Sequence, residues 1–305
     1  MTTVAIQTFN LRKDFGSTRA LFDLNLQVNA GEVVGCLGPN GAGKTTLIRL
    51  LLGLLVPTAG RAEIFGLDSR RQTVEAHRRI AYVPGEANLW PTLSGAETLR
   101  LLGRVHGHID EDYQVALIDR FGLDETKRVR ALSKGNRQKL ILVAALMTRA
   151  DVLILDEPTN GLDPLMEQAF RLCVHEAKER GQSVLLSSHI LSEVEALCDR
   201  IGILRSGELV EMGTMAEMRH LSALTVEAIF EGSVPDVTQV SGVSMVEVQG
   251  SRVRCQVRGS IEPLLSVFAR SGVVELLSRE PSLEELFLSH YGAPTSEVAS
   301  ARPAQ

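Results

Sequence analysis

Eight consecutive residues near the start of the chain have the composition of a phosphate-binding loop. Residues 38–45 match the pattern G-x-x-x-x-G-K-[ST], and an apolar run precedes them. Glycines let backbone N–H groups approach phosphate oxygens, and a helix that starts there adds a favourable dipole. Lys44 should reach the β- and γ-phosphates of ATP, and the Thr45 hydroxyl should coordinate Mg²⁺. The expected nucleotide contacts in and beside the loop are Gly38, Pro39, Asn40, Gly41, Ala42, Gly43, Lys44, Thr45 and Thr46.

Two adjacent carboxylates follow a second apolar run. Residues 152–155 are all apolar, and Asp156 and Glu157 come directly after them. In a doubly wound sheet, ligands bind at the carboxyl ends of the strands. We expect Asp156 to hold Mg²⁺, directly or through water, and Glu157 to act as the general base toward an attacking water. Capping of the next turn is the alternative role for either acid.

The elements around these motifs predict an α/β fold. Residues 33–37 form a short apolar run typical of a strand buried on both faces, and a leucine-rich helix should follow over 43–55. Residues 92–150 should be mainly helical, with Ser94 and Glu97 forming a capping box. Further strands are predicted over 4–9, 22–28, 80–83, 152–155 and 184–187, further helices over 110–121, after Ser133 and from Pro164 to Gly181, and a hairpin over 201–212.

The pattern changes near residue 220. Alternating strands are predicted over 224–230, 243–248, 252–257 and 273–277, with helices over 261–270 and 282–290. The tail is rich in Ala, Pro and Ser, which is typical of disorder. The predicted organisation is a nucleotide-binding domain over 1–220 with a helical subdomain over about 86–150, a small α+β domain over 221–292, and a disordered tail over 293–305.

Composition excludes several classes of function. The 305 residues carry a net charge of -5, and without a long basic run the chain is a poor candidate for binding nucleic acid. The four cysteines show no zinc or redox spacing, so free thiols in a reducing cytosol are expected. No segment is apolar enough to cross a membrane, and no signal peptide is apparent. We therefore expect a cytoplasmic protein, held at the membrane only through a partner.

In their order and spacing, the motifs resemble those of the nucleotide-binding subunit of an ABC transporter, over roughly residues 4–215. Residues 132–138, Leu-Ser-Lys-Gly-Asn-Arg-Gln, resemble the family signature LSGGQ. Residues 160–163 resemble the D-loop, His189 resembles the switch histidine, and Phe15 stands where the family usually places an aromatic ring against adenine. The resemblance implies a P-loop NTPase core of the ABC type with a helical subdomain.

The resemblance also implies how the residues work together. Two subunits, which we expect to be copies of this chain in a homodimer, would face each other head to tail and trap two ATP molecules, each held by the phosphate loop of one subunit and by Ser133 and Gly135 of the other. His189 would hold the γ-phosphate and position the water, and Asp163 would communicate between the sites. Taken alone, Ser133 is also a good helix cap, His189 an ordinary loop histidine and Phe15 a core residue.

The sequence departs from the family in two places. After the strand over 80–83 the family usually has a glutamine, where this chain has Gly85. We hypothesise that the neighbouring Glu86 approaches the metal instead, and unchanged Mg²⁺-dependent turnover in Glu86→Ala would contradict this. In the signature, Lys134 and Asn136 replace the usual residues, and Lys134 either adds a contact to the facing ATP or is simply solvated.

The resemblance favours an ATP-hydrolysing subunit that powers an exporter. Its permease would be a separate membrane chain, and Trp90 would border the groove that receives it, unless Trp90 packs inside the helical subdomain. Residues 280–287 resemble the extension of exporter subunits, for which drug, antibiotic or lipid-like substrates are common. The alternatives are a soluble ABC-type ATPase acting on nucleic acid or the ribosome, which usually has two cassettes or a coiled coil, and a nucleotide switch with slow hydrolysis.

Overall fold

A mostly parallel sheet carries the predicted motifs. The computed structural model describes residues 3–220 and 224–279. Neighbouring strands from β10 to β7 run parallel, and β11 joins β10 across the turn Ser206-Gly207, where both residues have positive φ. The spatial order is β11 (Glu208–Thr214), β10 (Arg200–Arg205), β4 (Val33–Leu37), β9 (Ser183–Ser188), β8 (Val152–Asp156) and β7 (Ile80–Val83).

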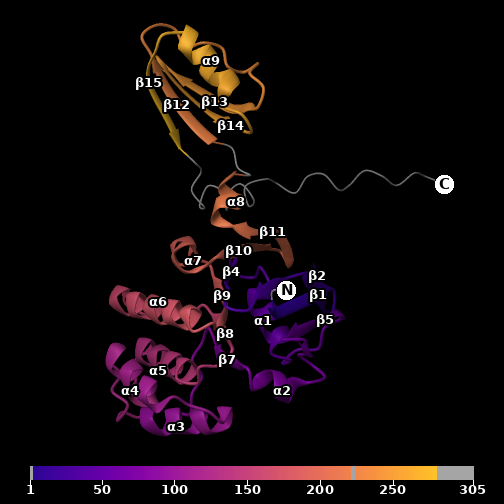
Figure 1. The fold of residues 1–305 in the computed structure, drawn as a ribbon, viewed down its shortest axis with the longest axis vertical. Helices are drawn as coiled ribbons and strands as arrows, with labels where there is room; N and C mark the ends of the chain where they lie inside the picture. Colours follow the sequence, from indigo (N-terminus) through magenta and orange to yellow (C-terminus); the bar gives the residue numbers. More distant parts are fainter. Residues whose placement is uncertain (1–2, 221–223, 280–305) are drawn as a thin grey trace, which may run out of the picture. The chain divides into compact units, whose positions relative to one another are not determined.

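The two faces of this sheet are covered by different layers (Figure 1). Alternate residues of β8 enter different cores: Leu153 and Leu155 pack with the helices α3 to α6, and Val152 and Ile154 pack on the side of α1. Because layers cover both faces of the sheet, every residue of β4, β8 and β9 is buried. The helices are α1 (Lys44–Leu51), α2 (Thr73–His77), α3 (Gly95–His106), α4 (Glu111–Arg120), the 3₁₀ turn η1 (Val129–Ala131), α5 (Lys134–Leu146), α6 (Pro164–Glu179) and α7 (Leu191–Leu197).

The capping residues predicted from the sequence begin their helices as expected. The Ser94 hydroxyl accepts from the backbone of Glu97, whose carboxylate accepts from the backbone of Ser94, so the capping box starts α3. Ser133 caps α5 and Asp163 caps α6, which has proline at its first position. These helix starts fix the directions of the loops that enter the site.

A smaller antiparallel sheet covers the α1 side of the first unit. Its strand order is β2-β1-β5-β6, and β3 also pairs with β1. The strand predicted over 22–28 is interrupted at Asn25 and Leu26, where the Asn25 side chain accepts from the Asn10 backbone. The strands are β1 (Val4–Phe15), β2 (Thr18–Leu24), β3 (Gln27–Asn29), β5 (Ala59–Ile64) and β6 (Leu67–Asp68).

The second unit is a four-stranded antiparallel sheet with a helix on one face. Its core includes an edge-to-face contact between Phe230 and Phe268, whose ring centroids lie 5.2 Å apart. The strands and the helix predicted within 224–279 are confirmed. In spatial order the strands are β13 (Val243–Gln249), β14 (Arg252–Val257), β12 (Leu224–Phe230) and β15 (Val273–Arg279), and the helices are α8 (Met215–His220) and α9 (Glu262–Arg270).

The chain divides into the units Met1–Met212 and Gly213–Gln305, so α8 groups with the second unit. The boundary at residue 220 and the helical subdomain over 86–150 stay predictions. The helix over 282–290, the segment 280–287 and the tail over 293–305 lie outside the described residues.

Candidate functional site

The phosphate loop connects β4 to α1 and surrounds a small pocket. The pocket has a volume of about 160 Å³. Gly41 and Gly43 have φ values of 83° and 109°, which residues with a Cβ adopt at a cost. Gly38 leaves no room for a side chain, because a Cβ there would lie 2.5 Å from the Leu204 carbonyl oxygen. The pocket is lined by residues 39–46 together with Ala20 and Glu157.

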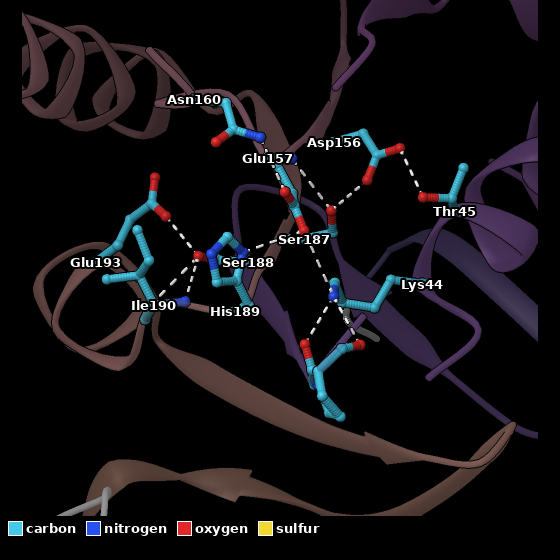
Figure 2. Close-up of polar contacts among 12 residues, drawn as sticks. Lys44, Thr45, Asp156, Glu157, Asn160, Ser187, Ser188, His189, Ile190 and Glu193 are labelled. Carbon is cyan, nitrogen blue, oxygen red and sulfur yellow. Dashed lines mark hydrogen bonds and ion pairs between the residues drawn. The ribbon is translucent and has the colours of Figure 1, made fainter. Parts of the chain in front are cut away.

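Lys44 is the cation that lines this pocket, and Figure 2 shows its polar contacts. Its ammonium group donates to the carbonyl oxygens of Gly38 and Pro39, at 2.6 and 3.2 Å, and lies 3.5 Å from Glu157 Oε1. The side chain is only 6% exposed. A buried cation requires compensation, which these carbonyls and the carboxylate provide. Lys44 therefore places a positive charge at the N-terminus of α1, where a phosphate group would bind.

Thr45 and Asp156 meet on the other side of the loop. The Thr45 hydroxyl donates to Asp156 Oδ2 at 3.0 Å, and the Ser187 hydroxyl donates to Asp156 Oδ1 (Figure 2). Magnesium prefers oxygen ligands, and in nucleotide sites it takes one or two from the protein and the others from phosphates and water. The hydroxyl of Thr45 and the carboxylate of Asp156 fit such an ion.

Glu157 is the residue on which the site converges. It has a φ of 47°, and its backbone N–H donates to the Ser187 carbonyl oxygen at 3.0 Å, so the chain turns sharply where β8 ends. The Asn160 amide donates to Glu157 Oε2 at 2.9 Å, and His189 Nδ1 lies 3.2 Å from Glu157 Oε1 (Figure 2). Asn160, His189 and Lys44, which come from three separate parts of the chain, thus hold the Glu157 carboxylate beside the pocket.

The thiol nearest to this site is unreactive. Burial raises the pKa of Cys36 to about 12, with Lys44 and Asp156 as the nearby charges. A thiol with that pKa stays protonated at neutral pH and is a poor nucleophile. All four cysteines are free, in agreement with the sequence prediction.

The signature segment lies against the loop that follows Glu157. The Ser133 hydroxyl accepts from the Asn136 backbone at 3.2 Å, and the Ser133 side chain is exposed. The buried Gln138 amide donates to the Pro158 carbonyl oxygen at 2.9 Å. At Gly135, a Cβ would lie 2.6 Å from the Gly161 carbonyl oxygen. The start of α5 and the loop over 158–161 are therefore in direct contact.

Three other predicted site residues, Asp163, Phe15 and Glu86, lie in distinct settings. Asp163 accepts from the backbones of Leu165 and Met166, each at 3.1 Å, so it caps α6 whatever else it does. Phe15 is 49% exposed at the end of β1, with the Lys13 ammonium 4.9 Å from its ring centre, which argues against a core role.

Glu86 is exposed, and in the described part of the chain no ion pair joins it to another residue. Gly85 lies beside Asp156: a Cβ there would be 3.4 Å from the Asp156 carbonyl oxygen and 3.9 Å from its carboxylate. A larger residue at 85 would therefore reach the Asp156 carboxylate directly. The Glu86 substitution for this contact stays a hypothesis.

Sequence reasoning missed two partners of the acidic pair. Ser187 holds Asp156, and Asn160 holds Glu157. Ser187 ends a predicted parallel strand, and polar residues at that end of a sheet point toward the ligand edge. Asn160 was placed only within the D-loop resemblance, because nothing in its spacing shows that a turn returns its side chain to Glu157.

A second, larger hollow in the first unit is mainly apolar. It has a volume of about 710 Å³, and Trp90 on its rim is 52% exposed. The alternative in which Trp90 packs inside the helical subdomain is therefore wrong. Exposed apolar side chains that gather around a hollow mark a binding surface. The lining includes Leu54, Val74, Tyr82, Pro84, Leu89, Trp90, Leu102, Val105 and Ala144.

Comparison with known proteins connects this geometry to a family. A family model described as ABC transporter matches residues 21–160. The bacitracin transport ATP-binding protein BcrA of Bacillus licheniformis is 41% identical over 214 residues, which cover 69% of this chain and 70% of that protein. The linearmycin resistance ATP-binding protein LnrL of Bacillus subtilis (strain 168) is 32% identical over 305 residues, which cover 94% and 98%.

The fold is also found among solved structures. A structure described as the ATP binding subunit of an ABC transporter matches with a TM-score of 0.67 and 32% sequence identity, over 70% of this chain and 92% of that one. None of the described helices is sufficiently long and apolar for a membrane span.

Proposed function

The chain belongs to the ABC transporter family as an ATP-hydrolysing subunit of the exporter type, and from that premise we propose that it powers the efflux of an antibiotic or a similar drug. The observation that carries the proposal is the similarity to subunits named for bacitracin transport and linearmycin resistance, in one case along almost the whole chain. Co-purification with the permease, followed by ATPase assays with candidate antibiotics, tests it. We expect at least one antibiotic to stimulate ATP hydrolysis by the complex. If no class of antibiotic stimulates it, the proposal is contradicted.

For the chemical step, Glu157 serves as the general base and His189 as the residue that holds the γ-phosphate and positions the water. The contact of 3.2 Å between His189 Nδ1 and Glu157 Oε1 supports this pairing. Lys44 binds the β- and γ-phosphates with the backbone of the loop. The test is phosphate release by wild type and Glu157→Gln, where we expect a loss of at least about 100-fold, and equal rates contradict the assignment.

Magnesium would be held by Thr45 and Asp156. When bound, the ion supplies positive charge to the phosphate oxygens and lowers the electrostatic cost of charge developing there. The Ser187 hydroxyl orients the Asp156 carboxylate. Glu86 is retained as an additional ligand only as a hypothesis.

Two copies, in this proposal, complete each other's sites. Ser133 and Gly135 begin α5, where backbone N–H groups and the helix dipole favour a phosphate, and the exposure of Ser133 leaves it accessible to a second subunit. Phe15 stacks against adenine, and its exposed ring supports that role. Asp163 connects the two sites. Either a homodimer or a pair with a related chain satisfies this arrangement.

The apolar hollow around Trp90 is the proposed docking surface for a cytoplasmic segment of the permease. Its size and its exposed apolar rim suit an inserted helix. Docking there would place the subunit on the inner face of the cell membrane.

A further inference from the structure

One buried carboxylate near the site has no role in the chemistry described above. Glu193 lies in the first turn of α7 and is 4% exposed. Burial raises the pKa of Glu193, while the hydrogen bond from the Ser188 hydroxyl opposes that rise. Burying a carboxylate is costly unless it forms specific hydrogen bonds. Glu193 Oε1 is buried without a hydrogen-bond partner among the described residues, so the carboxylate depends on the hydrogen bond to Oε2 to compensate for the lost hydration.

That hydrogen bond comes from the Ser188 hydroxyl (Figure 2). That hydroxyl donates to Glu193 Oε2 at 2.5 Å and accepts from the Ile190 backbone N–H at 2.9 Å. Ile190 precedes the first residue of α7, and Glu193 is the third residue of the helix. In a capping box the glutamate would accept directly from the backbone N–H of the residue that precedes the helix, here Ile190. Here a serine hydroxyl stands between them, so the carboxylate, the hydroxyl and the N–H form a relay.

The relay involves the residues on both sides of His189 in the chain. Ser188 and Ile190 are its two neighbours in the chain, and both are fixed by the same hydroxyl. The Ser188 carbonyl oxygen also accepts from the Gly38 backbone N–H at 3.3 Å, which connects this turn to the start of the phosphate loop. His189 itself is 43% exposed, so packing does little to hold its ring beside Glu157. The backbone on either side must do so.

We propose that Glu193 is a positioning residue for ATP hydrolysis, which acts through Ser188 to hold His189 against Glu157. This inference rests on the proposed role of His189. A capping role alone would stabilise α7 without affecting the chemical step. Positioning predicts instead a loss of turnover that depends on the presence of His189.

The experiment is a double-mutant cycle measured by steady-state phosphate release. Glu193→Leu removes the acceptor at similar volume, and Glu193→Gln keeps an acceptor oxygen. Each is made in wild type and in His189→Ala, and ATP affinity and thermal melting are measured for all. Glu195→Leu is the control, because it removes an exposed acid from the same helix. Ser188→Ala breaks the relay at its centre if Glu193→Leu does not fold.

We expect Glu193→Leu to lower kcat by about 10-fold or more with KM for ATP within twofold, since a small misplacement costs turnover rather than binding. Glu193→Gln should retain kcat within about threefold, and Glu193→Leu should add less than twofold in His189→Ala. The melting temperature of Glu193→Leu should not fall below that of wild type, because an apolar side chain replaces a buried charge.

Equal losses from Glu193→Leu in both backgrounds, or no loss in wild type, would overturn the positioning role. An unchanged kcat in His189→Ala would overturn the proposed role of His189, and the relay with it.

Discussion

Adding one methyl group at Gly135 tests whether the signature segment must lie where the structure places it. A Cβ at this position would lie 2.6 Å from the Gly161 carbonyl oxygen, so the two segments must separate by about 0.8 Å to reach ordinary contact. Overpacking of this kind costs about 1–3 kcal/mol. Alanine in place of glycine in a helix returns about 1 kcal/mol. We expect Gly135→Ala to lower the free energy of unfolding by about 0–2 kcal/mol.

The effect on turnover should be larger than the effect on stability. A displacement near 1 Å at a catalytic contact costs about 100-fold in rate, so we expect Gly135→Ala to hydrolyse ATP about 10- to 100-fold more slowly. Binding of ATP to the phosphate loop of the same chain should stay within twofold, because that loop is not in contact with Gly135. Phosphate release, equilibrium binding of a fluorescent ATP analogue and denaturant unfolding measure the three quantities.

The control for Gly135→Ala is Gly232→Ala, which adds the same methyl group where no atom lies within 4 Å and φ is not positive. It should behave as wild type in all three assays. Unchanged turnover in Gly135→Ala would refute the idea that α5 must start in close contact with Gly161. An equal loss of ATP affinity would refute its separation from the phosphate loop.

Three further predictions concern the metal, the permease and pH. Asp156→Asn should raise the Mg²⁺ concentration for half-maximal turnover by about tenfold or more, because a charged oxygen ligand is lost; an unchanged Mg²⁺ titration contradicts the ligand assignment. Trp90→Ala should abolish most permease-dependent stimulation without changing ATP affinity, whereas Leu172→Ala, equally exposed on α6, should not; stimulation assays of the two complexes decide. The hydrogen bond from Arg120 lowers the pKa of Glu176, so its stabilisation is present above the ordinary pKa of about 4.3 and is lost as pH falls through the lowered value. Glu176→Gln should therefore be about 1 kcal/mol less stable than wild type at pH 7 and equal to it in strong acid, measured by denaturant unfolding across pH.

Local signals predicted the elements that hold the site. β4 and the first four residues of β8 are apolar, and Ser94 and Asp163 cap their helices with their own side chains, so each element could be predicted from a few neighbouring residues. The phosphate loop and the acidic pair were equally local. The structure adds what no local pattern contains, namely that Thr45 and Asp156, 111 residues apart, meet at 3.0 Å.

Other features depended on interactions distant in sequence. The apolar alternation over 22–28 continues across Asn25 and Leu26, and only the bond between Asn25 and the Asn10 backbone shows that the strand breaks there. The helix predicted over 43–55 ends at Leu51, because Gly53 adopts a φ of 64° and turns the chain early. The relay through Ser188 was equally hidden, since a glutamate in a first helical turn reads as an ordinary surface acid.

The bond from the Gln138 amide to the Pro158 carbonyl oxygen has a consequence for how the proposed dimer would work. Pro158 directly follows Glu157, the proposed general base, whereas Gln138 lies on the helix whose first residues would face the ATP of the opposite subunit. In that dimer, a rearrangement around Glu157 would be transmitted to the nucleotide of the other subunit through the buried hydrogen bond between Gln138 and Pro158. The two active sites would then exchange information about hydrolysis within each subunit, and not only across the interface between them.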